Sequence, residues 1–82
     1  MTNDENTTQF AEIVADVLEV GTEAVTDSAG PQTLAAWTSL RHLELIVTLQ
    51  EAYGVAFTYQ EVRDTMSIGH LRSALRAKGA PV

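Results

Sequence analysis

The sequence contains no cysteine, so neither a disulfide nor a thiolate metal site is available. No apolar run approaches the roughly 20 residues that a membrane-spanning helix needs, so no membrane partner is expected. The first residues, MTNDENTTQF, are polar and acidic and do not resemble a signal peptide, which makes a cytoplasmic location the default expectation. With 82 residues, the chain is long enough for one small domain.

Lysine and arginine are absent from residues 1–40, where seven acids give a charge of −7. Residues 41–82 carry four acids and five bases, or +1, and the two parts add to the net charge of −6. A surplus of negative charge repels phosphate backbones and argues against a nucleic-acid partner. A partner that is steered by charge is therefore expected to be basic.

Residues suited to metal or catalytic chemistry are sparse. His42 and His70 are far apart, the acids do not cluster at ligand spacing, and no glycine-rich phosphate loop is present. His42 lies one turn after Ser39 but is expected to face the core, and no third group is evident to orient it. The sequence thus predicts no metal site and no enzyme, and His42 is expected to be a half-buried structural residue.

Helical periodicity is the regular pattern of this chain, and no segment alternates like a strand. It predicts an all-α fold, a small bundle of three main helices plus one short helix with a long first loop. The helices are expected at about residues 7–18, 39–53, 59–64 and 67–78. The domain is expected to span residues 7–79, between a flexible tail at 1–6 and a C-terminal tail at 80–82.

Capping signals mark the ends of these helices. Thr38 is a candidate N-cap, and Thr58 with Glu61 has the spacing of a capping box. Gly54 and Gly79 follow the last turns of two helices, a common way to end a helix.

The segment from Gly21 to Thr38 has no sustained period and contains the break DSAGPQT. A loop of this length in so small a domain is often functional. Leu34 and Trp37 are expected to attach it to the core.

The helix at 39–53 is apolar on two faces when its residues are placed at about 100° each. The inner face gathers Leu45, Ile46, Leu49, Ala52 and Tyr53. The outer face holds Leu40, Leu43 and Val47, flanked by Glu44 and Glu51. Either the outer face is covered, by a neighbouring loop or because the helix is central in the bundle, or it is a docking surface with an apolar centre and an acidic rim. Periodicity alone leaves both interpretations open.

Ser39 stands at the first position of this helix. Serine at a helix start is usually a cap, but Thr38 can take that role and leave Ser39 free. The unpaired N–H groups of a helix N-terminus stabilise an anion. A phosphodiester attached to Ser39 would therefore be well placed.

The stretch WTSLRHLELIVTLQEAYGVAFTYQEVRDTMSIGHLRSAL, residues 37–75, resembles an acyl carrier protein of the phosphopantetheine-binding carrier domain family. A weaker likeness reaches back to Phe10. In this family an Asp-Ser-Leu motif opens the second helix, and the match here is Thr38-Ser39-Leu40.

The resemblance implies that Ser39 is esterified by 4′-phosphopantetheine, which a magnesium-dependent phosphopantetheinyl transferase takes from coenzyme A. The arm would hold acyl groups as thioesters for acyl-loading and acyl-processing enzymes. It also implies a monomeric carrier rather than an enzyme.

The resemblance further implies roles for two sets of residues. The partner-docking positions are Thr38, Leu40, Arg41, Leu43, Glu44, Val47 and Glu51. The positions that form the core and the acyl cavity are Leu45, Ile46, Leu49, Tyr53, Phe57, Ile68 and Leu71.

Two residues depart from the family pattern. Thr38 stands where aspartate is usual, and Arg41 lies on a side of the helix that is often acidic. These departures favour polyketide or related specialised biosynthesis over a housekeeping fatty-acid carrier. The segment LAAWTSL lacks the Gly-Gly of aminoacyl and peptidyl carriers, which disfavours that class. An unmodified, degenerate carrier that acts as an interaction module is the alternative from another class.

Overall fold

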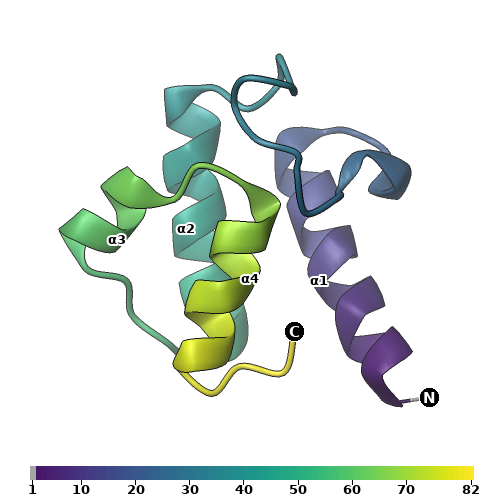
Figure 1. The fold of residues 1–82 in the computed structure, drawn as a ribbon, viewed down its shortest axis with the longest axis vertical. Helices are drawn as coiled ribbons and strands as arrows, with labels where there is room; N and C mark the ends of the chain where they lie inside the picture. Colours follow the sequence, from purple (N-terminus) through teal and green to yellow (C-terminus); the bar gives the residue numbers. More distant parts are fainter. Residues whose placement is uncertain (1) are drawn as a thin grey trace.

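The computed structural model describes the backbone of residues 2–82 and the side chains of residues 8–82. Within this range the chain is all-helical, without strands, which confirms the predicted small bundle with a long first loop. Its elements are α1 (Thr2–Leu18), the 3-10 turn η1 (Thr22–Ala24), α2 (Ser39–Tyr53), α3 (Tyr59–Asp64) and α4 (Ile68–Ala77). In Figure 1, α1 and α3 lie on opposite sides of α2, and the first loop, residues 19–38, runs over one end of the bundle.

The two ends of the chain differ from the predicted tails. The first helix begins at Thr2 instead of near residue 7, so residues 2–6 are helical, while Met1 lies outside the described residues. No glycine or proline interrupts the sequence of α1. At the other end, Ala80 and Val82 are buried in the core, and Arg76 Nε donates to the Val82 carbonyl at 2.8 Å. Residues 80–82 therefore pack against the bundle.

The predicted helix starts are formed as expected. The Thr38 hydroxyl accepts a hydrogen bond from the Arg41 backbone N–H at 3.2 Å and caps α2. Thr58 and Glu61 form both bonds of a capping box at the start of α3, at 3.1 and 2.8 Å. The last helix follows Ser67, whose hydroxyl accepts from the backbone of the third helical residue at 3.2 Å.

Three helices end in a left-handed residue. Gly54 and Gly79 have φ of 63° and 90°, in agreement with their predicted role, and Glu19 has φ of 59°. In each case the following N–H donates to the carbonyl five residues back, at 3.0 Å after α1, 3.2 Å after α2 and 2.9 Å after α4. This conformation is unfavourable for a residue with a Cβ, so the end of α1 needs support from elsewhere.

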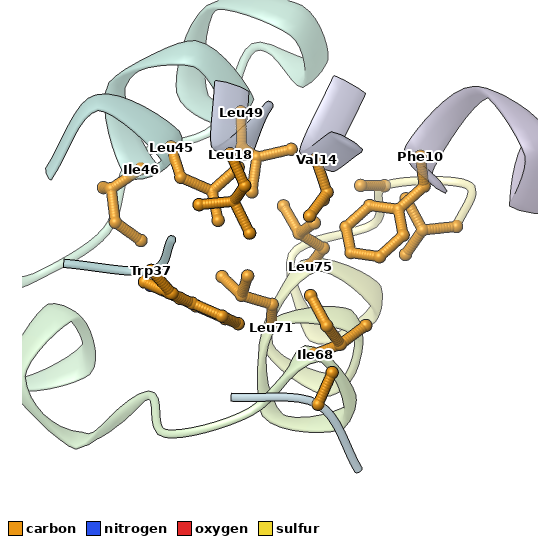
Figure 2. Packing of buried hydrophobic residues seen from close by; sticks show 13 residues of the cluster. Phe10, Val14, Leu18, Trp37, Leu45, Ile46, Leu49, Ile68, Leu71 and Leu75 are labelled. Carbon is orange, nitrogen blue, oxygen red and sulfur yellow. The ribbon is translucent and has the colours of Figure 1, made fainter. Parts of the chain in front are cut away.

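One continuous apolar cluster forms the core (Figure 2). Its largest fully buried side chains are Phe10, Val14, Leu18, Leu45, Leu49, Ile68, Leu71 and Leu75. They come from α1, α2 and α4, and none comes from α3. The short third helix is therefore held mainly by partly buried contacts and polar links.

The first loop is attached to the start of α4 and to the core. Carbonyls of Asp27 and Ala29 accept from the backbone N–H groups of Gly69 and Ile68 at 2.9 and 2.8 Å. These are donors that the first turn of a helix leaves unpaired. Trp37 is only 3% exposed and closes one side of the cluster in Figure 2, as the sequence predicted.

The outer face of α2 is open to solvent. Leu40, Leu43 and Val47 are 66%, 55% and 50% exposed, so the first loop does not cover them. On the inner face of the same helix, Leu45, Ile46 and Leu49 are buried, whereas Ala52 is exposed. Of the two interpretations of this face, the covering loop is thereby excluded within the described chain.

Truncation of the two faces of α2 should have different costs. Leu49→Ala removes a fully buried side chain and should lower the free energy of unfolding by about 2–5 kcal/mol. Val47→Ala should change it by less than about 0.5 kcal/mol, because half of that side chain is already in water. Urea unfolding followed by circular dichroism measures both. Equal losses would mean that the outer face is packed in solution.

The capping box of α3 is also tied to the end of α4. Lys78 Nζ lies 2.9 Å from both carboxylate oxygens of Glu61 and 5.3 Å from the centre of the Phe57 ring. The Thr58 backbone hydrogen bond, followed by the bonds from Lys78, holds the pKa of Glu61 below the usual range of a glutamate.

This lowered pKa predicts acid sensitivity of the fold. The contribution of Glu61 is present above the usual glutamate pKa of about 4.3 and is lost as the pH falls through the lower, folded-state value. Unfolding midpoints measured from about pH 6 to pH 3 should therefore fall less steeply for Glu61→Gln than for the wild type. Parallel curves would show that the carboxylate does not stabilise α3 in solution.

Candidate functional site

Ser39 occupies an unobstructed position at the start of α2. It is exposed, and its hydroxyl makes no hydrogen bond to any residue from 8 to 82. Thr38 supplies the cap instead, through its bond to the Arg41 N–H. The backbone N–H groups of Ser39 and Leu40 come too early in the helix to have intrahelical acceptors. An anion on this hydroxyl would therefore meet the positive end of the helix dipole.

A pocket of about 350 Å³ opens directly beside this serine. Its walls come from three parts of the chain. They are Pro31 and Trp37 of the first loop, Thr38, Ser39, His42 and Leu43 of the start of α2, and Tyr59, Val62, Arg63, Thr65 and Met66 around α3. The pocket is thus built where the loop, α2 and α3 meet.

A pair of hydrogen bonds on the His42 ring fixes this junction. Trp37 Nε1 donates to His42 Nδ1 at 3.0 Å, and His42 Nε2 lies 2.8 Å from the carbonyl oxygen of Val62. An indole N–H can only donate and a carbonyl can only accept, so the imidazole is neutral and carries its proton on Nε2. The ring therefore links the loop, α2 and α3 in one chain of hydrogen bonds.

This arrangement also settles the role of His42 relative to Ser39. Both ring nitrogens are engaged by Trp37 and Val62, so neither is free to accept a proton from the serine hydroxyl. The ring is partly buried, which confirms the predicted structural histidine. Among residues 8–82, His42 is therefore not placed to act as a base for Ser39.

Arg41 turns away from the docking positions with which the sequence grouped it. Its Nη1 donates to the Val17 carbonyl at 2.7 Å, and its Nη2 lies 3.0 Å from the Glu19 carboxylate. The guanidinium thus supports the left-handed end of α1 identified above. It also lies 3.9 Å from a carboxylate oxygen of Glu44. Its charge is consequently matched by neighbouring groups.

The other predicted docking residues are exposed. Leu40, Leu43, Glu44, Val47 and Glu51 lie along α2, and Thr38 directly precedes the helix. The structure adds two exposed apolar side chains that periodicity missed, Tyr59 at 80% and Met66 at 50%. Both line the pocket, so the exposed apolar surface of α2 continues around it.

The predicted acyl-cavity residues lie elsewhere. Of the seven, Leu45, Ile46, Leu49, Ile68 and Leu71 are buried in the core, and Tyr53 and Phe57 pack against it. The Tyr53 hydroxyl is enclosed without a partner among the described residues, and burial raises its pKa. None of the seven lines the pocket beside Ser39.

The pocket itself was missed because its walls are distant in sequence. The predicted short helix at 59–64 did place Val62 and Tyr59 on an element that follows α2. No sequence signal connected Val62 with Trp37, because the His42 ring provides that link only in the folded chain.

The described residues were also compared with metal sites, membrane-spanning helices and known proteins. Among residues 8–82, no three or more His, Asp or Glu side chains are grouped so that they could hold a metal ion. None of the helices described here has the length and apolar character needed to cross a membrane. Comparison with models of known protein families and with curated proteins finds no match to this chain.

Removal of the His42 ring nitrogens should destabilise the junction. His42→Phe leaves the buried Trp37 indole N–H and the Val62 carbonyl without partners, and it should cost about 1–3 kcal/mol. His70→Phe is the matched control, because His70 is exposed and accepts only a long bond of 3.4 Å; it should change stability by less than about 0.5 kcal/mol. Guanidinium unfolding measures both. Equal stabilities would show that the bridge contributes nothing to the fold.

Proposed function

We propose that this protein is an acyl carrier whose Ser39 bears a 4′-phosphopantetheine arm. The observation that carries the proposal is the free, exposed hydroxyl of Ser39 on the first turn of α2, beside a pocket and an exposed apolar face. The all-helical layout with a long first loop and a short third helix is consistent with the family resemblance of residues 37–75.

The residues around Ser39 fit such an arm. The phosphodiester would take the unpaired N–H groups of the first turn of α2, where the helix dipole favours negative charge. The Thr38 hydroxyl caps α2, so the Ser39 hydroxyl is not needed for the cap and is available for modification. When bound, the arm would supply a thiol that carries acyl groups as thioesters.

Attachment is a phosphoryl-group transfer that needs a partner enzyme. In the proposed step, the Ser39 oxygen forms a bond to the phosphorus that bears pantetheine. The bond from this phosphorus to the bridging oxygen of coenzyme A breaks, and adenosine 3′,5′-bisphosphate leaves with that oxygen. The hydroxyl proton passes to a base of the magnesium-dependent transferase, since His42 is engaged elsewhere.

The exposed face of α2 is the proposed docking surface for the transferase and for the acyl-loading and acyl-processing enzymes. Leu40, Leu43 and Val47 form its apolar centre, and Glu44 and Glu51 provide acidic groups. Because Arg41 binds the end of α1, it places little positive charge toward a basic partner. Such encounters are steered by charge and remain weak enough for release.

The carrier is proposed to work as a monomer in the cytoplasm, in polyketide or related specialised biosynthesis. The support for this pathway class is the Thr38-Ser39-Leu40 motif, which lacks the aspartate of the usual pattern. The protein itself would perform no catalysis. It would raise the effective concentration of the acyl group at each partner enzyme.

Modification should depend on Ser39 alone. Wild type incubated with a promiscuous phosphopantetheinyl transferase, coenzyme A and Mg²⁺ should gain the mass of one phosphopantetheine, and Ser39→Ala should gain none. Ser73→Ala, which removes an exposed hydroxyl from α4, is the matched control and should be modified like the wild type. Intact-mass spectrometry distinguishes these results. Modification of Ser39→Ala would overturn the assignment, and an unmodified wild type would favour the degenerate interaction module.

A further inference from the structure

We propose that the cargo of this carrier is a short apolar acyl group, aromatic or branched, which folds back into the pocket beside Ser39 instead of entering the core. This inference rests on the proposed function and names the substrate class that the site would take. Two observations carry it: the size and chemistry of the pocket, and the closure of the core.

The size of the pocket suits a small cargo. Its volume of about 350 Å³ lies at the lower end of the roughly 300–1,000 Å³ that small-molecule sites occupy. A ring or a short branched chain suits such a volume, and a long linear chain would extend beyond it. Ser39 itself lines the pocket, so a flexible arm attached there can return its end to it.

The chemistry of the wall favours apolar cargo. Trp37 Nε1 and both nitrogens of His42 are already paired, and the Thr65 hydroxyl donates to the Glu61 carbonyl at 2.6 Å. The centroids of the indole and imidazole rings are 5.9 Å apart, and the ring planes are tilted by 32°. The rings can therefore contact a cargo through their faces rather than through hydrogen bonds. Leu43, Val62 and Met66 add aliphatic and thioether surface. Aromatic groups and thioethers make favourable contacts with rings.

The polar groups of Tyr59 and Arg63 lie at the exposed edge of the pocket. Tyr59 is 80% exposed, and the Arg63 side chain is 58% exposed and pairs with Asp64 at 3.2 Å. Neither places an unpaired charge on the inner wall. A cargo with polar groups along its whole length would leave them unpaired there, at a cost in binding free energy.

The core between α2 and α4 is closed to solvent. Leu45 and Leu49 of α2 and Ile68, Leu71 and Leu75 of α4 are all 0% exposed. Entry of a long chain between these helices would separate side chains that are packed against one another, and protein interiors resist such insertion. The side pocket, in contrast, is open and has Ser39 in its wall.

To test this inference, the carrier is loaded with different acyl groups, and the environment of the pocket wall and the protection of the thioester are measured. A promiscuous transferase with Mg²⁺ and either coenzyme A, phenylacetyl-coenzyme A or tetradecanoyl-coenzyme A gives the arm alone or with a short aromatic or a long linear cargo. Trp37 is the only tryptophan, so its emission reports on the pocket wall. The rate of thioester cleavage by hydroxylamine, relative to the same free coenzyme A thioester, reports protection.

The phenylacetyl form should change the Trp37 emission relative to the arm alone and should slow cleavage several-fold. The tetradecanoyl form should show a smaller change in emission and a smaller decrease in the cleavage rate. Equal behaviour of the two cargoes, stronger protection of the long chain, or a full emission change with the arm alone would overturn the inference while leaving the carrier function intact. Absence of any added mass on Ser39 would instead overturn the proposed function, and the inference with it.

Two variants of α2 provide a matched test of location. Leu43 and Val47 are exposed to a similar degree, 55% and 50%, but only Leu43 lines the pocket. Leu43→Ala should reduce the protection of the phenylacetyl thioester, and Val47→Ala should retain it. Circular dichroism melting checks that both variants are folded. Equal protection in the two variants would place the cargo elsewhere.

Discussion

The two hydrogen bonds on the His42 ring are the constraint on which the candidate site depends. They join Trp37 of the first loop to the carbonyl of Val62 in α3 through a side chain of α2. Since α3 contributes no fully buried side chain, it has little hydrophobic anchorage of its own. Together with the Lys78–Glu61 link, the bridge therefore helps to set the distance of α3 from the start of α2, and with it the width of the pocket beside Ser39. The same bonds occupy both ring nitrogens of His42, so the ring has no free nitrogen to offer to Ser39.

The elements of the fold could be predicted because their signals are local. Thr58 and Glu61 form the capping box that their spacing indicated, and Gly54 ends α2 in the left-handed conformation that glycine favours. The start of α1 could not be predicted from periodicity, because its polar first turns carry no apolar repeat. The pocket could not be predicted either, because its walls meet through tertiary bonds of the His42 ring. The end of a helix depends on residues that are adjacent in sequence, whereas this pocket is formed by residues that are far apart in sequence.

Arg41 shows how a sequence pattern can miss the role of a side chain. It lies on α2 among the predicted docking positions, yet its guanidinium reaches the end of α1, where Glu19 holds a conformation that costs a residue with a Cβ about 1–2 kcal/mol. The bond to the Val17 carbonyl also satisfies an acceptor that the end of a helix leaves unpaired. A cation at this place suits the negative end of the α1 dipole. The arginine therefore stabilises the junction of two helices and leaves the exposed face of α2 apolar and acidic.

Thr38 separates two roles that an aspartate at this position would combine. An aspartate can cap a helix and also adds a negative charge next to the serine, whereas the Thr38 hydroxyl provides the cap alone, through its 3.2 Å bond to the Arg41 N–H. Threonine and aspartate can thus both cap α2, and they differ in the electrostatic field that they place around Ser39. With one fewer negative charge, a phosphodiester on Ser39 would experience less repulsion, but a basic transferase would be attracted less strongly. In the proposed carrier, recognition would then depend more on the apolar side chains of Leu40, Leu43 and Val47, which the structure leaves exposed along α2.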